Sequence, residues 1–187
     1  GTVGLEYMYI SDQEQKRWLQ QRFESVRSKA TLSVEQKKHL LERLTAAETL
    51  EKYLHTRYVG QKRFSLEGGD TLIPIMDELI QRAGAQGVKE AVIGMAHRGR
   101  LNVLVNNLGK SYESVFSEFE DSPDVDAPFG SGDVKYHKGF TLDRTVAPGE
   151  RVHLTLTSTP SHLEAVDPVV VGRAKAKQVR AGDREGQ

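Results

Sequence analysis

The sequence predicts an α/β fold with a mainly parallel sheet, flanking helices and a helical layer at its N-terminal end. Apolar residues recur at helical spacing before residue 55 and again after residue 70. Two short runs, 91–93 and 152–156, are rich in apolar and β-branched residues and are typical of strands. Each run leads into a polar segment, as strands of α/β proteins lead into ligand-binding loops. We expect a helical layer over 1–55 and a partial α/β domain over 56–187.

The composition limits the classes of function. Lys plus Arg and Asp plus Glu are both 26, so no overall basic field favours nucleic acid as a partner. No apolar run is long enough to span a membrane. The absence of cysteine excludes disulfides, thiolate metal sites and a thiol nucleophile.

The first 55 residues are predicted to be mainly helical. Residues 1–10 carry aromatic and β-branched types and are expected to be extended. Three residues show the capping-box pattern that starts a helix, with Glu or Gln three positions later: Ser11, Ser33 and Thr45. The simplest interpretation is that these helices pack on the larger domain; a partner-binding module is the alternative.

A further helix is predicted from Asp70, its N-cap, to Gly84, with Pro74 in the first turn. The preceding segment 62–69, KRFSLEGG, joins two cations, an aromatic residue and two glycines. Its composition alone is compatible with an ordinary solvated turn.

The central stretch is 94–110, in which His97-Arg98-Gly99-Arg100 follows the strand 91–93. Apolar residues then recur at helical spacing up to Leu108, and Gly109 occupies a C-cap position. The N-terminus of this helix would offer N–H groups and partial positive charge. The residues alone therefore predict an anion site with His97 beside it.

The remaining elements follow in order. A helix is predicted after its cap Ser111, followed by a long loop over 121–139 that ends in Lys135-Tyr136-His137. Loops of this length are usually functional or disordered. The strand 152–156 ends in a second polar exit, 158–164, and a last helix is expected over 169–180.

Four motifs occur together in this chain: KRFSLEGGD at 62–70, HRGRLNVL at 97–104, GDVKYH at 132–137 and PSHLE at 160–164. In this order they resemble the thiamine-diphosphate-dependent, decarboxylating component of the 2-oxoglutarate dehydrogenase complex. Chains of that family are several times longer, so the sequence resembles an internal piece.

The resemblance implies part of a thiamine-diphosphate-binding fold. It implies a parent oxidoreductase, homodimeric and acting in the tricarboxylic acid cycle, that decarboxylates 2-oxoglutarate and succinylates the lipoyl group of dihydrolipoyl succinyltransferase. The isolated piece is expected to be inactive. A bacterial cytoplasm is the expected location, with the mitochondrial matrix as the alternative.

The resemblance also implies roles for individual residues. His97 and His137 match the active-site histidines, with roles in catalysis and substrate binding. The other matched positions are Arg98, Ser161 and Leu163, which together with His137 would bind the cofactor, and Phe64, which with Ser161 would line the substrate pocket. Arg100 is expected to make a structural contact instead.

Magnesium, which anchors this cofactor, is held in the family by an aspartate in a Gly-Asp-Ala-Ala stretch and a downstream asparagine. Gly182-Asp183 is followed by Arg184-Glu185 and departs from that pattern. We therefore assign no metal ligand and expect the magnesium ligands outside the chain.

Three alternatives remain. A relative that uses 2-oxoadipate shares HRGR and similar loops, although LNVLVNNLGK favours the 2-oxoglutarate enzyme. A non-catalytic anion-binding or assembly module could use Arg98 and Arg100, and would be favoured if His97 and His137 lay far apart. A zinc site from His97, His137 and a carboxylate is a third interpretation, with no recognised ligand spacing. No motif surrounds three further histidines, which we interpret as surface or structural residues: His39, His55 and His153.

Overall fold

The computed structural model describes residues 4–27, 29, 31–120, 135–147, 149–158 and 162–183. The chain forms two compact units, residues 1–39 and 40–187, which are described separately. The predicted division after residue 55 stays a prediction. Of the helices in the described ranges, none is long and apolar enough to cross a membrane.

The first unit contains helix α1 (Gln13–Glu24). The helix begins one residue later than predicted from Ser11, because the Asp12 carboxylate accepts hydrogen bonds from the N–H groups of Glu14 and Gln15, both at 2.9 Å. Residues 4–10 form no strand, contrary to expectation; they include a turn in which the Ile10 N–H donates to the Tyr7 carbonyl at 3.1 Å.

Helix α2 (Val34–Arg57) is capped as its sequence predicts. The Ser33 N–H donates to Gln36 Oε1 at 2.9 Å, and the Gln36 N–H donates to Ser33 Oγ at 3.2 Å. The predicted new start at Thr45 is wrong, since α2 continues without interruption. Glu48 pairs instead with Lys52 one turn later, at 2.7 Å.

The second unit contains a three-stranded sheet of β1 (Glu90–Ile93), β2 (Phe140–Val146) and β3 (Glu150–Leu156), in the order β1-β3-β2. The α/β class is confirmed, but the sheet is only partly parallel. Strand β1 is parallel to β3, whereas β2 is antiparallel to it. The three residues between β2 and β3 permit a hairpin and are too few for a parallel crossover.

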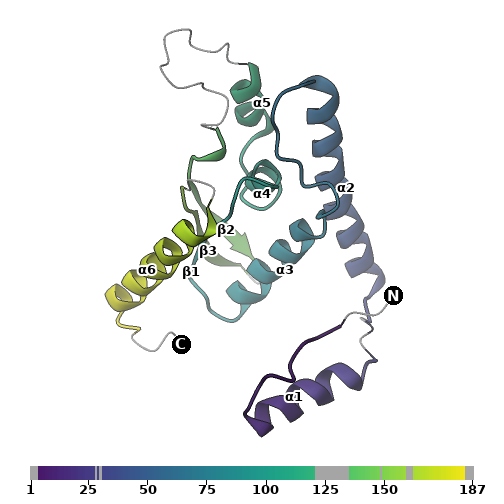
Figure 1. Cartoon of the computed structure of the whole chain (residues 1–187), viewed down its shortest axis with the longest axis vertical. Coiled ribbons are helices and arrows are strands. Elements are labelled where there is room, and N and C mark those ends of the chain that lie inside the picture. The colour runs from purple at the N-terminus through teal and green to yellow at the C-terminus, as the bar shows by residue number, and fades with distance from the viewer. Residues whose placement is uncertain are drawn as a thin grey trace. The chain divides into compact units, whose positions relative to one another are not determined.

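The described part of this unit contains four further helices: α3 (Leu72–Ala85), α4 (Arg100–Asn106), α5 (Tyr112–Glu120) and α6 (Leu163–Ala181). Helix α3 packs against β2 and β3, and α6 packs against β1 (Figure 1). Helix α6 begins at Leu163, earlier than the predicted residue 169.

Two residues predicted to bound α3 have other roles. Thr71, not Asp70, is the N-cap, and Asp70 Oδ2 accepts from the Gly68 N–H at 3.1 Å. Gly84 lies inside the helix against the sheet, where a Cβ would come within 2.4 Å of a Val146 methyl and 2.7 Å of a Val152 methyl. This contact explains the glycine better than a helix end does.

Candidate functional site

The charged turn follows β1 as the sequence predicts. The backbone reverses at Gly99, whose φ of 75° is left-handed, and the Arg100 N–H donates to the His97 carbonyl at 2.9 Å. Helix α4 then starts at Arg100. The turn therefore presents His97 half-buried and Arg98 exposed at the carboxyl end of a parallel strand.

The segment 62–69 is tied directly to this turn. The Gly99 N–H donates to the Phe64 carbonyl at 2.9 Å, and Arg98 Nη1 donates to the Ser65 carbonyl at 2.8 Å. Phe64 has a φ of 45°, a conformation that non-glycine residues rarely adopt and that concentrates at functional sites. The Phe64 ring lies 4.7 Å from the imidazole of His97, measured between centroids.

A third segment brings Tyr136 and His137 to the same place. The Tyr136 side chain is fully buried, and its hydroxyl donates to the Lys62 carbonyl. Its ring packs edge-on against Phe64 at 4.8 Å and lies 5.5 Å from His97. The His97 and His137 rings are 4.7 Å apart between centroids. We call these four rings, of Phe64, His97, Tyr136 and His137, the aromatic cluster.

A buried carboxylate of α2 joins the 62–69 loop, which carries Phe64, to helix α4. Glu51, 3% exposed, accepts hydrogen bonds from Arg63 Nη1, the Leu66 N–H and Asn102 Nδ2, each at 3.1 Å. Asn102 Nδ2 also donates to the Ala47 carbonyl at 2.9 Å. Through these contacts, helix α2 fixes both the loop that carries Phe64 and helix α4.

Arg100 points away from solvent and is 0% exposed. It donates to the carbonyls of Met95 at 3.2 Å and of Lys138 and Thr157 at 2.8 Å. Burial lowers the pKa of its guanidinium to about 10, so it stays charged at neutral pH. These backbone contacts agree with the structural role expected for Arg100.

The turn offers an anion fewer backbone N–H donors than the sequence predicted. Helix α4 has only seven residues, and the N–H groups of Gly99 and Arg100 already donate to protein carbonyls. Of the predicted features, the exposed Arg98 side chain is therefore the one best suited to contact an anion.

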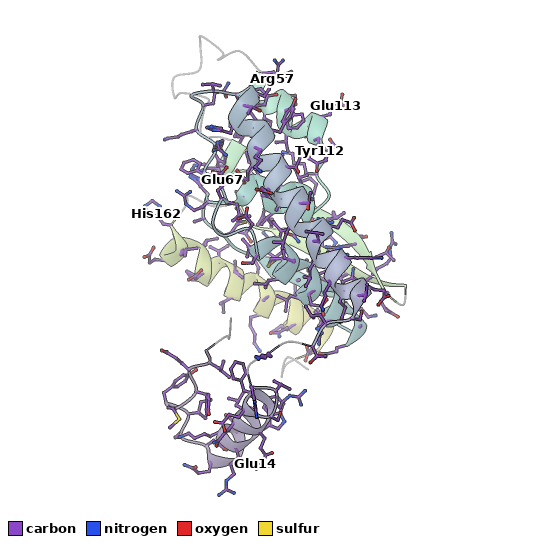
Figure 2. The ribbon with its side chains drawn as sticks, turned by 90° about the vertical axis from the view of Figure 1, so that its right-hand side faces the viewer. Glu14, Arg57, Glu67, Tyr112, Glu113 and His162 are labelled. Carbon is purple, nitrogen blue, oxygen red and sulfur yellow. The ribbon has the colours of Figure 1, made fainter. Side chains whose placement is uncertain are left out.

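The polar segment 158–164, which follows β3, lies only partly within the described residues. Ser161 lies outside the described residues. Leu163 is the first residue of α6 and is 49% exposed, and His162 before it is the N-cap without a side-chain capping bond. In Figure 2 the His162 side chain projects outward from the start of α6. No contact that the structure describes joins Leu163 to the aromatic cluster.

Two other features limit the chemistry. Within the described ranges, no group of three or more His, Asp or Glu residues could hold a metal ion, and the zinc interpretation gains no third ligand there.

A surface pocket of about 510 Å³ is lined by residues of α2 and of the 62–69 loop, among them Glu48 and Glu67, and not by the aromatic cluster.

Sequence reasoning missed Glu51 and Asn102. A signal for Glu51 was present, because it falls at helical spacing from the buried Ala47 and Leu54, a position that otherwise favours an apolar residue. Asn102 likewise interrupts the apolar face of α4. Of the histidines given no site role, His55 Nδ1 lies 3.2 Å from Arg63 Nη2 and His153 pairs with Asp143 at 2.6 Å. The assignment of these two and of His39 stays a prediction.

The chain is similar in sequence to several known proteins. The chain is 62% identical over 183 residues to the 2-oxoglutarate dehydrogenase E1 component of Cupriavidus necator, and this match covers 98% of the chain and 19% of that protein. It is 56% identical to the same component of Azotobacter vinelandii over 100% of the chain, and 50% identical to that of Haemophilus influenzae over 99%; each match again covers 19% of the longer protein. No family model matches the chain. The chain therefore belongs to the family of 2-oxoglutarate dehydrogenase E1 components, and it spans about 19% of the length of these relatives.

Proposed function

We propose that this chain forms one part of the active site of a 2-oxoglutarate dehydrogenase E1 component. The parent decarboxylates 2-oxoglutarate with thiamine diphosphate and transfers the succinyl group to the lipoyl group of dihydrolipoyl succinyltransferase, as a homodimer in a bacterial cytoplasm. The observation that carries the proposal is the 4.7 Å separation of the His97 and His137 rings. A non-catalytic module would not require two histidines from distant segments to meet.

The residues present fit part of the cofactor's requirements. Arg98 supplies an exposed cation for the diphosphate, and Ser161 and Leu163 are proposed as further cofactor contacts. Thiamine diphosphate, when bound with magnesium, supplies the nucleophilic carbon and the electron sink for decarboxylation. We assign no residue of this part to magnesium, because Gly182-Asp183 departs from the family's metal-binding pattern.

The two imidazoles are proposed to bind substrate and handle protons. An imidazole can donate a hydrogen bond from one ring nitrogen and accept at the other, and it exchanges protons near neutral pH. With rings in contact, His97 and His137 can act on neighbouring atoms of one 2-oxo acid, donating to a carboxylate or to a developing oxyanion. A preorganised donor of this kind contributes about 3 kcal/mol to transition-state stabilisation.

Phe64 and Tyr136 are proposed to shape the site rather than to react. Phe64 contacts His97 from a backbone conformation that the surrounding hydrogen bonds maintain. Tyr136 is fully buried behind it. Together they restrict the rotation of the His97 ring and limit its access to water, which strengthens its hydrogen bonds to a substrate.

Turnover on two substrates tests the proposed reaction. The full-length protein should decarboxylate 2-oxoglutarate with a higher kcat/KM than 2-oxoadipate. Preference for the longer acid would instead assign the chain to the 2-oxoadipate-using relatives. Turnover of neither acid, with cofactor bound, would favour the anion-binding module.

Calorimetric titration of thiamine diphosphate with magnesium tests the role of Arg98. Arg98→Ala in the full-length protein should weaken cofactor binding by at least about tenfold, the loss of one charge-assisted contact. Arg82→Ala is the matched control, since Arg82 is an exposed arginine on α3 paired with Glu78 at 2.6 Å. Equal binding by both variants would remove Arg98 from the cofactor site.

A further inference from the structure

Arg100 has an unusual environment for a charged residue. Its side chain is completely buried, yet its described hydrogen-bond partners are backbone carbonyls and include no carboxylate. Its Nε–H is also buried and has no hydrogen-bond partner among the described residues. Burying a cation without a counter-ion is costly, so a role in packing alone would be served better by an apolar side chain.

The three carbonyls belong to three different segments. Met95 follows β1 and lies two residues before His97, and Thr157 is the residue after β3. Lys138 is the neighbour of His137. One planar guanidinium therefore joins the exits of two parallel strands to the segment that carries the second histidine.

These contacts determine where the two imidazoles lie relative to each other. The His97 carbonyl accepts from the Arg100 N–H at 2.9 Å, so the backbone of Arg100 fixes one histidine. Its side chain fixes the backbone beside the other through Lys138 at 2.8 Å. A lysine would keep the charge in this position, but one ammonium on a flexible stem does not reproduce the rigid fork that spans three segments.

We propose that Arg100 is a positioning residue that sets the spacing of His97 and His137, an inference that rests on the proposed function of those two histidines. It acts through backbone carbonyls and touches neither substrate nor cofactor. The essential property of Arg100 is the simultaneous contact of its guanidinium with three segments, not its charge.

The test compares Arg100→Lys with Arg144→Lys in the full-length protein. Arg144 is a suitable control because it also bridges segments, donating to the Asn107 carbonyl at 3.2 Å and pairing with Asp77, but it contacts no residue next to a histidine of the aromatic cluster. In Arg100→Lys, kcat for 2-oxoglutarate should fall by about 10- to 100-fold, while KM changes by less than about threefold. Arg144→Lys should lower Tm and leave kcat unchanged.

A second readout does not depend on turnover. The rate at which diethyl pyrocarbonate modifies each histidine can be followed by mass spectrometry in the same variants. Arg100→Lys should change the rates at His97 and His137 severalfold and leave the rate at His153, which lies in β3, as in the wild type. Arg144→Lys should change neither rate within the aromatic cluster.

Each outcome decides the proposal. A folded Arg100→Lys protein with wild-type kcat and wild-type histidine reactivity overturns it. If this variant does not fold, Gly139→Ala replaces it, because a Cβ there would meet the Leu156 carbonyl and Ser158 Oγ, both at 2.9 Å. The Lys138 segment or the end of β3 must then shift, and both supply a carbonyl to Arg100; wild-type kcat in that variant also overturns the proposal. If the wild type itself does not turn over 2-oxoglutarate, the proposed function fails, and the reactivity comparison alone decides the positioning role.

Discussion

Gly99 is required at the charged turn for two separate reasons. Its φ is 75°, and a Cβ at this position would lie 2.5 Å from Leu66 Cδ1. Gly99→Ala should lower the free energy of unfolding by about 2–4 kcal/mol, the sum of the left-handed backbone and the overpacking.

Gly60 separates these two contributions. It has a similar φ of 78°, but no atom lies within 4 Å of the position that a Cβ would take, so Gly60→Ala should cost only about 1–2 kcal/mol. Urea unfolding of both variants measures the difference. Equal destabilisation would mean that the contact with Leu66 imposes no constraint on the turn.

Glu51 is expected to be the most sensitive carboxylate of α2. Glu51→Ala would remove the buried carboxylate that accepts from Arg63, the Leu66 N–H and Asn102, and should destabilise the chain by about 3–5 kcal/mol in chemical denaturation. Glu48→Ala on the same helix removes only an exposed pair with Lys52, worth at most about 1 kcal/mol. Similar losses in the two variants would contradict the network.

Residue-level prediction worked where a local motif carried the information. The composition of the 97–100 turn predicted a charged strand exit, and the family motifs singled out His137 and Phe64. Glu51 could be suspected from its place on an apolar helix face, but its partners could not, because Arg63, Leu66 and Asn102 come from segments whose meeting depends on tertiary structure.

Among the elements, the β2–β3 hairpin carries a titratable cross-strand pair. Asp143 Oδ1 lies 2.6 Å from His153 Nδ1, and this hydrogen bond is the main cause that lowers the pKa of the Asp143 carboxyl below its ordinary value, with the His153 and Arg151 charges adding to it. A carboxyl with a lowered folded-state pKa contributes stability above its unfolded pKa. That contribution is lost as the pH falls through the folded value.

Removal of this carboxylate should therefore make the free energy of unfolding less dependent on pH in the acidic range. The free energy of unfolding of the wild type should decrease as the pH falls from about 5 towards 2, a window set by an ordinary Asp pKa near 3.9 and a lower folded value. Asp143→Asn should show a shallower decrease in the same denaturant titrations. An identical slope in both proteins would show that the pair does not contribute to stability.

The elements themselves were predicted unevenly. The helices and the strands β1 and β3 follow from periodicity, whereas β2 was not predicted even though Phe140, Leu142 and Val146 alternate with polar residues. The signal is weak because the polar Arg144 interrupts this alternation between Leu142 and Val146. The capping pattern at Thr45 wrongly predicted a new helix start, because α2 continues through this residue and overrides the local signal.

At the scale of the whole molecule, three segments distant in sequence meet at one edge of the sheet. The loop 62–69, the turn after β1 and residues 135–137 converge through backbone hydrogen bonds and ring contacts. Periodicity could not predict this convergence, since it depends on strand order and on loop paths.

His97 and His137 are proposed to act as one site. A double-mutant cycle on kcat/KM for 2-oxoglutarate, with His97→Gln and His137→Gln in the full-length protein, measures this directly. Residues in contact typically couple by about 0.5–3 kcal/mol, so the double variant should be less impaired than the two single effects combined. A control cycle between His97 and His153 should be additive. Additivity within about 0.5 kcal/mol for His97 and His137 would contradict the account.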